Sequence, residues 1–154
     1  PTRPAQLKET HMKIQQLSVF LENKPGSLKK ALSVLADAKV NISTLALADT
    51  KEFGILRLMI KDWEKAKAAL ETGGFTVKQT EVLAVEVEDR PGGLAAVLAP
   101  VEAAGVNVEY MYAYSTGGKG KAVLIFRFSD LDKAMSALKS AGMNVIEKLQ
   151  ALGA

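Results

Sequence analysis

One stretch of the sequence occurs twice, and this duplication restricts the folds open to the chain. Residues 22–28 (Glu-Asn-Lys-Pro-Gly-Ser-Leu) return as residues 88–94 (Glu-Asp-Arg-Pro-Gly-Gly-Leu), at an offset of 66 positions. The offset persists to residues 40–42 (Val-Asn-Ile) and 106–108 (Val-Asn-Val), and further on it becomes 68. Self-similarity of this length indicates two copies of one structural unit. The two extra residues of the second copy fall in the Gly-rich stretch 115–120, where a turn tolerates insertion.

The length of the chain agrees with two small units. Its 154 residues divide into copies of roughly 65–70 residues, a size at which a domain alone is only marginally stable. We therefore expect a first domain at residues 12–80, a second at 81–154, and packing between units or between chains. His11-Met12 resembles a cloning junction, so residues 1–11 are expected to be a vector-derived or disordered tail.

Composition argues against several classes of function. There is no cysteine, and the only histidine is His11 in the expected tail. No nucleophile–base pair and no metal-ligand spacing is found, so we expect no enzyme activity, no metal and no cofactor. The 20 basic and 17 acidic residues are interspersed, which is not the pattern of a nucleic-acid-binding surface. No apolar run is long enough to span a membrane, and a cytoplasmic protein is expected.

Residue periodicity predicts the same six elements in each copy. In the first copy, strands are predicted at Ile14–Leu21, Val40–Ala48, Phe53–Lys61 and Phe75–Thr80, with helices over residues 28–38 and Trp63–Thr72. In the second, strands are predicted at Leu83–Val87, Val106–Tyr114, Lys121–Phe128 and Met143–Lys148, with helices at Gly93–Ala104 and Leu131–Ala141. Asp62 and Asp130 precede helices and are expected to cap them. The predicted fold class is α+β: two ferredoxin-like β-α-β-β-α-β units, each an antiparallel four-stranded sheet with both helices on one face.

The repeated Pro-Gly turn has a chemical use. Proline fixes φ, glycine permits a sharp turn, and the helix that follows presents unpaired N–H groups and the positive end of its dipole. A small carboxylate fits such a helix start. Asn23 or Asp89 can contact an α-ammonium group or cap the helix, and Asn41 and Asn107 are expected near the same corner. The alternative is that Pro-Gly only makes a tight joint between strand and helix.

These residues resemble a known family. A strand, then Asp or Asn-x-Pro-Gly-x-Leu, then a helix, with Val-Asn-Ile or Val-Asn-Val opening the second strand, is similar to the ACT domain, and two in tandem resemble the stand-alone tandem ACT proteins. The first copy also resembles the ACT region of the acetolactate synthase regulatory subunit (residues 20–23, Phe-Leu-Glu-Asn). The resemblance implies a regulatory module that binds an amino acid where the first strand turns into the first helix, usually at an interface between two ACT units.

The ligand-binding residues implied by the resemblance come from both copies. They are Asn23, Pro25, Gly26, Ser27, Leu28, Asn41 and Ile42 in the first copy, and Asp89, Pro91, Gly92, Gly93, Leu94, Asn107 and Val108 in the second. The first copy departs from the family in having Asn23 where aspartate is common. Its site lacks a charge that can pair with an α-ammonium group, so it is expected to be weaker, altered or vestigial.

Three tyrosines alternate along one strand. Tyr110, Tyr112 and Tyr114 point to a single face of the predicted sheet, a face that Val123, Ile125 and Arg127 are expected to share. Three uses stay open for them: an interface with the other unit or a second chain, an aromatic wall of a ligand pocket, or a platform for stacking RNA bases.

The sequence thus predicts an amino-acid-binding regulatory protein that modulates an enzyme of amino-acid metabolism and forms a homodimer. One alternative is a structural or regulatory subunit that binds no ligand and docks through the tyrosine face. A second alternative is an RNA-binding module, against which the absence of a basic groove argues.

Overall fold

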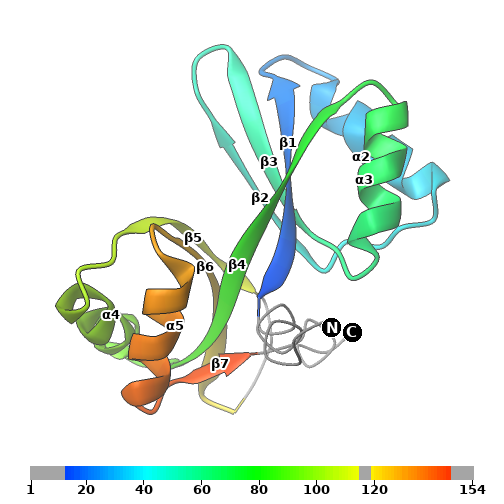
Figure 1. The fold of residues 1–154 in the computed structure, drawn as a ribbon. Coiled ribbons are helices and arrows are strands. Elements are labelled where there is room, and N and C mark those ends of the chain that lie inside the picture. The colour runs from blue at the N-terminus through cyan, green and yellow to red at the C-terminus, as the bar shows by residue number, and fades with distance from the viewer. Residues whose placement is uncertain (1–12, 115–118, 147–154) are drawn as a thin grey trace, which may run out of the picture. The chain divides into compact units, whose positions relative to one another are not determined.

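The computed structural model describes residues 13–114 and 119–146 (Figure 1). These residues fall into two compact units. The N-terminal unit is Gln15–Thr80, and the C-terminal unit comprises the described residues from Glu81 onward together with Lys13 and Ile14. The expected tail with His11, residues 115–118 of the Gly-rich turn and the predicted last strand beyond residue 146 lie outside the described residues.

The N-terminal unit has the predicted order of elements. They are β1 (Ile14–Glu22), α2 (Ser27–Asp37), β2 (Thr44–Asp49), β3 (Phe53–Met59), α3 (Trp63–Thr72) and the first part of β4 (Thr76–Glu88). The strands lie in the order β2-β3-β1-β4, and β3 is antiparallel to both of its neighbours. Both helices lie on the same side of the sheet (Figure 1). This is the ferredoxin-like arrangement.

The C-terminal unit repeats this plan. Its elements are the second part of β4, then α4 (Gly93–Ala103), β5 (Val108–Tyr114), β6 (Lys121–Phe128), α5 (Leu131–Ser140) and β7 (Asn144–Ile146). The strand order is β5-β6-β4-β7, with antiparallel pairing throughout. The predicted fold class is therefore confirmed in both units.

Each unit has its own hydrophobic core between helices and sheet. In the N-terminal unit the core is formed by Leu17, Val19, Leu21, Ala31, Leu35, Leu56, Leu58, Ile60, Ala66 and Leu70. In the C-terminal unit it includes Leu83, Val85, Val97, Val101, Phe126, Phe128, Ala134 and Leu138. Burying one such leucine, valine or phenylalanine side chain contributes about 1.5–3 kcal/mol, so the alternation along the strands fixes which face meets the helices.

Two predictions about strand limits are wrong. The two strands predicted at Phe75–Thr80 and Leu83–Val87 are one strand, because β4 runs without interruption from Thr76 to Glu88. No glycine or proline lies in this stretch, so nothing in it opposes an extended backbone. The second strand begins at Thr44 rather than Val40. Lys39 has a positive φ of 57°, and the Val40 amide donates to the Leu35 carbonyl at 3.0 Å, so these residues close α2 before the strand starts.

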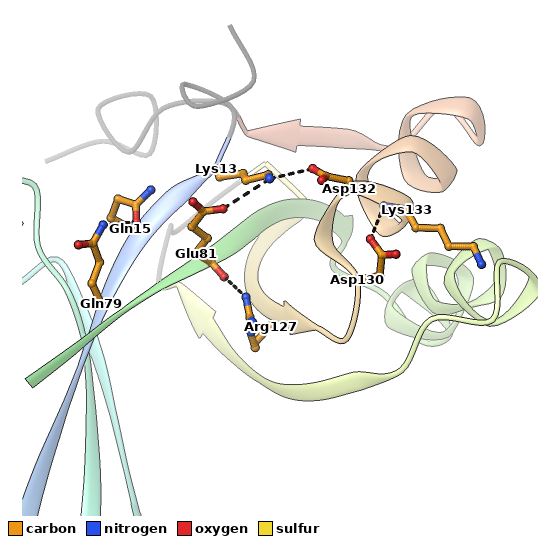
Figure 2. Close-up of polar contacts among 8 residues, drawn as sticks. All are labelled: Lys13, Gln15, Gln79, Glu81, Arg127, Asp130, Asp132 and Lys133. Carbon is orange, nitrogen blue, oxygen red and sulfur yellow. Dashed lines mark hydrogen bonds and ion pairs between the residues drawn. The ribbon is translucent and has the colours of Figure 1, made fainter. Parts of the chain in front are cut away.

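The two helix caps differ, although both were predicted. The Asp130 carboxylate accepts a hydrogen bond from the Lys133 amide at 3.0 Å (Figure 2). Asp62 makes no such bond, and that prediction is wrong. Its φ of −94° and ψ of 57° are not the extended values found at Asp130, so its carboxylate is not directed at the helix amides.

The three tyrosines lie on the sheet face opposite the helices, as predicted. The register pairs Tyr110 with Arg127, Tyr112 with Ile125 and Tyr114 with Val123. Tyr114 and Ile125 are buried, with 4% and 0% of their surface exposed, whereas Tyr110 and Tyr112 are half-buried.

Candidate functional site

The Pro-Gly turn of the N-terminal unit leaves the start of α2 unsatisfied. Gly26 is the N-cap residue, in the left-handed region at φ 88° and ψ −16°, and no side chain caps the helix. The Lys30 amide donates to the Gly26 carbonyl at 3.0 Å. The amides of the two preceding residues, Leu28 and Lys29, have no acceptor in the described part of the chain. The left-handed conformation favours glycine, and the free amides face outward at the positive end of the helix dipole.

The C-terminal unit repeats this geometry with a tighter joint. Gly92 is the N-cap residue at φ 84° and ψ −6°, again without a side-chain cap. The amides of Leu94 and Ala95 find no acceptor among the described residues. A Cβ atom on Gly93 would overlap the carbonyl oxygen of Glu88, whereas the first unit accommodates Ser27 at the equivalent position. Gly93 is therefore required by the close approach of strand and helix.

The space outside each turn is open. A Cβ atom on Gly26 or on Gly92 would meet no atom within 4 Å. Pro25 and Pro91 are exposed. Among the described residues, none therefore occupies the space beside Gly26 or Gly92.

Both turns are tied to the hairpin that follows the helix. The Asn23 amide donates to the Glu52 carbonyl at 2.9 Å, and the Asp89 amide donates to the Gly120 carbonyl at 2.9 Å. The Asn23 side-chain amide also reaches the Thr50 carbonyl at 3.5 Å. Asn23 thus holds the hairpin and does not cap α2.

Each strand before a turn ends in a glutamate that pairs with a lysine. Glu22 lies 2.9 Å from Lys24, and Glu88 pairs with Lys121. The hydrogen bond from Lys24 lowers the pKa of the Glu22 carboxyl below its ordinary value. The hydrogen bond from Lys121 lowers the pKa of Glu88 in the same way. Both carboxylates stay ionised at neutral pH.

A small pocket of about 70 Å³ lies at the first turn. It is lined by Leu21, Glu22, Asn23, Lys24, Ser27, Leu28, Leu47, Asp49 and Gly54. This volume holds a few water molecules, so it suits the polar head of an amino acid better than a whole side chain. Leu47, Asp49 and Gly54 were missed by the sequence reasoning. Their place follows from the topology, because the hairpin of β2 and β3 returns to the end of the sheet where the turn lies.

Asn41 and Asn107 do not lie at the turns of their own units, which corrects the expectation that they share that corner. The Asn107 backbone amide donates a hydrogen bond to Ser129 Oγ at 2.9 Å, beyond the end of β6. Asp89 is bonded to Gly120, which precedes β6. The eight residues of β6 span roughly 26 Å at about 3.3 Å per residue. In the first unit, Ser43 similarly bonds Met59 while Asn23 bonds Glu52.

Asn107 and Val108 instead line an open groove of about 450 Å³ beside the C-terminal end of α4. The other lining residues are Leu98, Val101, Glu102, Gly105 and Val106. Within one unit the predicted ligand residues therefore form two groups at opposite ends of the sheet: the turn, and the residues that lead into the second strand.

Comparison with known proteins decides the family. The family model described as an ACT domain pair matches residues 12–151. The chain belongs to this family. Each described unit is thus one ACT unit, and the resemblance drawn from the duplicated turn is confirmed.

Two proteins are similar to this ACT pair in sequence. It is 38% identical to protein BT0572 from Bacteroides thetaiotaomicron, with a TM-score of 0.81 over 88% of this chain and 92% of that one. It is 30% identical over 79 residues to the acetolactate synthase small subunit of Buchnera aphidicola subsp. Baizongia pistaciae (strain Bp). That match covers 51% of this chain and 50% of the relative, so the shared part is about half of each.

A more distant likeness concerns the fold alone. The ligand-free regulatory subunit of aspartate kinase from Thermus thermophilus is 15% identical, with a TM-score of 0.62 over 85% of the ACT pair and 92% of that chain. The described residues of the ACT pair hold no cluster of three metal-ligating side chains. None of their helices is long and apolar enough to cross a membrane.

Proposed function

We propose that this ACT pair binds a small amino acid at its Pro-Gly turns and regulates an enzyme of amino-acid metabolism. The observation that carries the proposal is the state of the two helix starts. Each presents two adjacent amides that have no acceptor among the described residues, next to a left-handed glycine beside which a Cβ atom would meet no atom within 4 Å. A carboxylate placed there accepts both hydrogen bonds and lies at the positive end of the dipole.

The α-ammonium group requires a negative partner, and here the two sites differ. Asp89 offers a carboxylate beside the C-terminal turn. The equivalent Asn23 has no charge, and its side-chain nitrogen is already bonded to Thr50. Two carboxylates line the first pocket, those of Glu22 and Asp49, and Glu22 is paired with Lys24. We therefore expect the C-terminal turn to bind more tightly than the N-terminal turn, because Asp89 precedes its helix directly.

The remaining predicted ligand residues would contact the ligand from a second copy of the chain. Asn41 and Ile42, and likewise Asn107 and Val108, lie a strand's length from the turn of their own unit. In a homodimer with antiparallel units, the turn of one copy meets the asparagine of the other. A ligand bridging the two copies then changes how they pack, and a partner enzyme responds to that change. Coupling of about 1–3 kcal/mol is sufficient.

The names of two similar proteins support a regulatory role. The 30% identical relative is named as the small subunit of acetolactate synthase, and the aspartate kinase relative is named as a regulatory subunit. We propose by analogy that this chain regulates an enzyme and has no catalytic activity of its own.

Titration calorimetry of the full chain against each of the twenty amino acids tests the proposal. We expect heat from one or a few chemically related amino acids, and the Asp89→Asn variant to weaken the tighter of two binding events. The matched variant Asn23→Asp is expected to strengthen the weaker event. If none of the twenty binds, amino-acid sensing is wrong and a purely structural subunit takes its place.

A further inference from the structure

The two copies of the repeat differ in where they carry a carboxylate. Asn23 precedes the first Pro-Gly turn and Asp89 precedes the second, so only the second copy has a charge at this position. At the end of the second strand the difference is reversed. Strand β2 ends in Asp49, whereas the residue 66 positions later in the sequence is Ser115. Of these two positions, each copy has an aspartate at one, and the copies differ in which.

Strand alternation places Asp49 on the side of the sheet where α2 begins. Leu47 pairs with the core residue Leu56 of β3, so it lies on the face that meets the helices. Asp49, two residues further along β2, lies on the same face. It lines the pocket of about 70 Å³ together with Asn23 and Ser27. The Asp49 carboxylate and the unsatisfied amides of α2 are therefore on one side of the sheet.

The other carboxylate of this pocket, that of Glu22, is less suited to bind a ligand. Leu21 belongs to the core, so Glu22, the next residue of β1, projects toward the opposite face of the sheet. Its Oε2 atom also lies 2.9 Å from Lys24 Nζ. The Asp49 carboxylate, by contrast, forms neither an ion pair nor a hydrogen bond with the described residues. Its charge is available to a cationic group.

Gly54 leaves space beside Asp49. The two residues lie opposite each other in the register of β2 and β3, and both line the pocket. The equivalent residue of the C-terminal unit, 68 positions later, is Ala122. A Cβ atom on Gly54 would lie 3.4 Å from Leu47 Cδ1, and Gly54 does not have a positive φ. The fold therefore does not require glycine here, and its small size opens the pocket next to the carboxylate.

We propose that Asp49 binds the α-ammonium group of the amino acid at the first turn, in the role that Asp89 has at the second. The carboxylate of the same amino acid accepts from the amides of Leu28 and Lys29 at the start of α2. The bound amino acid thus joins α2 to the hairpin of β2 and β3, whereas Asp89 precedes its own helix. This inference rests on the proposed amino-acid binding and assigns the residue that replaces the charge missing at Asn23.

Titration calorimetry of the full chain with each of the twenty L-amino acids tests the role of Asp49. We expect Asp49→Asn to weaken the weaker of two binding events roughly tenfold, the effect of one hydrogen bond to a charged group, and to leave the tighter event unchanged. Asp49 is exposed, so folding is retained, as circular dichroism will verify. The double variant Asp49→Asn/Asn23→Asp returns a carboxylate to the turn and should recover most of the loss. The control Glu52→Gln, in the same hairpin but outside the pocket lining, should bind as the wild type does.

The outcomes distinguish a failure of this inference from a failure of the proposed function. If none of the twenty amino acids binds the wild-type chain, the proposed function is wrong, and the role of Asp49 is wrong with it. If an amino acid binds and Asp49→Asn changes neither event, or if a single event is abolished by Asp89→Asn, only the role of Asp49 is wrong. A larger effect of Glu22→Gln than of Asp49→Asn also overturns it, as does a loss that Asn23→Asp fails to recover.

Discussion

Leu94 occupies the position at which the binding hypothesis can be tested atom by atom. Its amide is one of the two at the start of α4 that have no acceptor in the described part of the chain, and its side chain is partly exposed. Removing this N–H breaks no hydrogen bond of the helix, because the first-turn amides have no partner within it. Proline is accepted in a first helical turn, and the preceding Gly93 has no Cβ to collide with the ring.

We therefore predict that Leu94→Pro weakens amino-acid binding at the C-terminal turn by roughly ten- to a hundredfold, the value of one hydrogen bond to a charged group. Leu94→Ala removes the same side chain and keeps the amide, so it is the matched control and should bind nearly as the wild type does. Calorimetry with the amino acid that binds the wild-type chain measures both. Equal loss in the two variants would show that the side chain, and not the amide, contacts the ligand.

At the scale of the helix, the duplication allows the aspartates before two equivalent helices to be compared in the same fold. Asp130 accepts a hydrogen bond from the Lys133 amide at the start of α5, whereas Asp62 makes no such bond at the start of α3. Both carboxylates lie near the positive end of a helix dipole, so this contribution is common to them. The difference in stability loss when each aspartate is replaced therefore measures the contribution of the hydrogen bond.

Asp130→Ala is predicted to lower the free energy of unfolding by about 1 kcal/mol more than Asp62→Ala does. Urea unfolding followed by circular dichroism gives both values. Asp130→Asn should recover most of the loss, because the asparagine oxygen accepts the same bond. Equal losses for the two alanine variants would mean that the dipole, rather than the cap, dominates at both helices.

Much of the element order was predictable from the sequence, for a definite reason. Leu56, Leu58 and Ile60 alternate and are fully buried, and the duplicated turn fixes where each unit begins its first helix. Periodicity reports burial, and burial fixes the face of each element. The limits of β4 were not predictable in the same way, because no turn residue marks where one unit ends and the next begins.

The candidate site was predictable only in part. The turns follow from Pro-Gly, but the sequence does not show which end of the sheet a residue reaches. Asn41 and Asn107 follow the helix in the sequence and were placed at the turn, whereas the helix returns the chain to the far end. Asp49 lies more than twenty residues from Asn23 in the sequence and lines the same pocket. The direction of the strands in the structure puts Asn41 and Asn107 at the end of the sheet far from the turn, and Asp49 at the end beside it.

At the scale of the whole molecule, Lys13 lies just before β1 and is attached by ion pairs to Asp132 and Glu81, all within the C-terminal unit. Figure 2 shows its amino group between two carboxylates, 2.8 Å from Asp132 and 3.5 Å from Glu81. The Glu81 carbonyl accepts a further hydrogen bond from Arg127 at 2.9 Å. The Lys13 side chain is 17% exposed, but its partners are 44% and 73% exposed. Solvent therefore screens the pairs, and each contributes roughly 0–1 kcal/mol.

The pH dependence of this attachment has a definite sign. The hydrogen bond to Asp132, together with the nearby Glu81 charge, raises the pKa of Lys13 above its ordinary value of 10.5, although partial burial opposes the shift. Its contribution to stability is therefore fully present below pH 10.5 and is lost as the pH rises through the higher pKa of the folded chain.

Lys13→Gln should lower the melting temperature at pH 8, and the difference from the wild type should shrink above the raised pKa. Lys65→Gln, at an exposed lysine without an ion pair among the described residues, should show neither effect. A Lys13→Gln difference that stays constant across this pH range would show that the side chain acts through packing rather than through its charge.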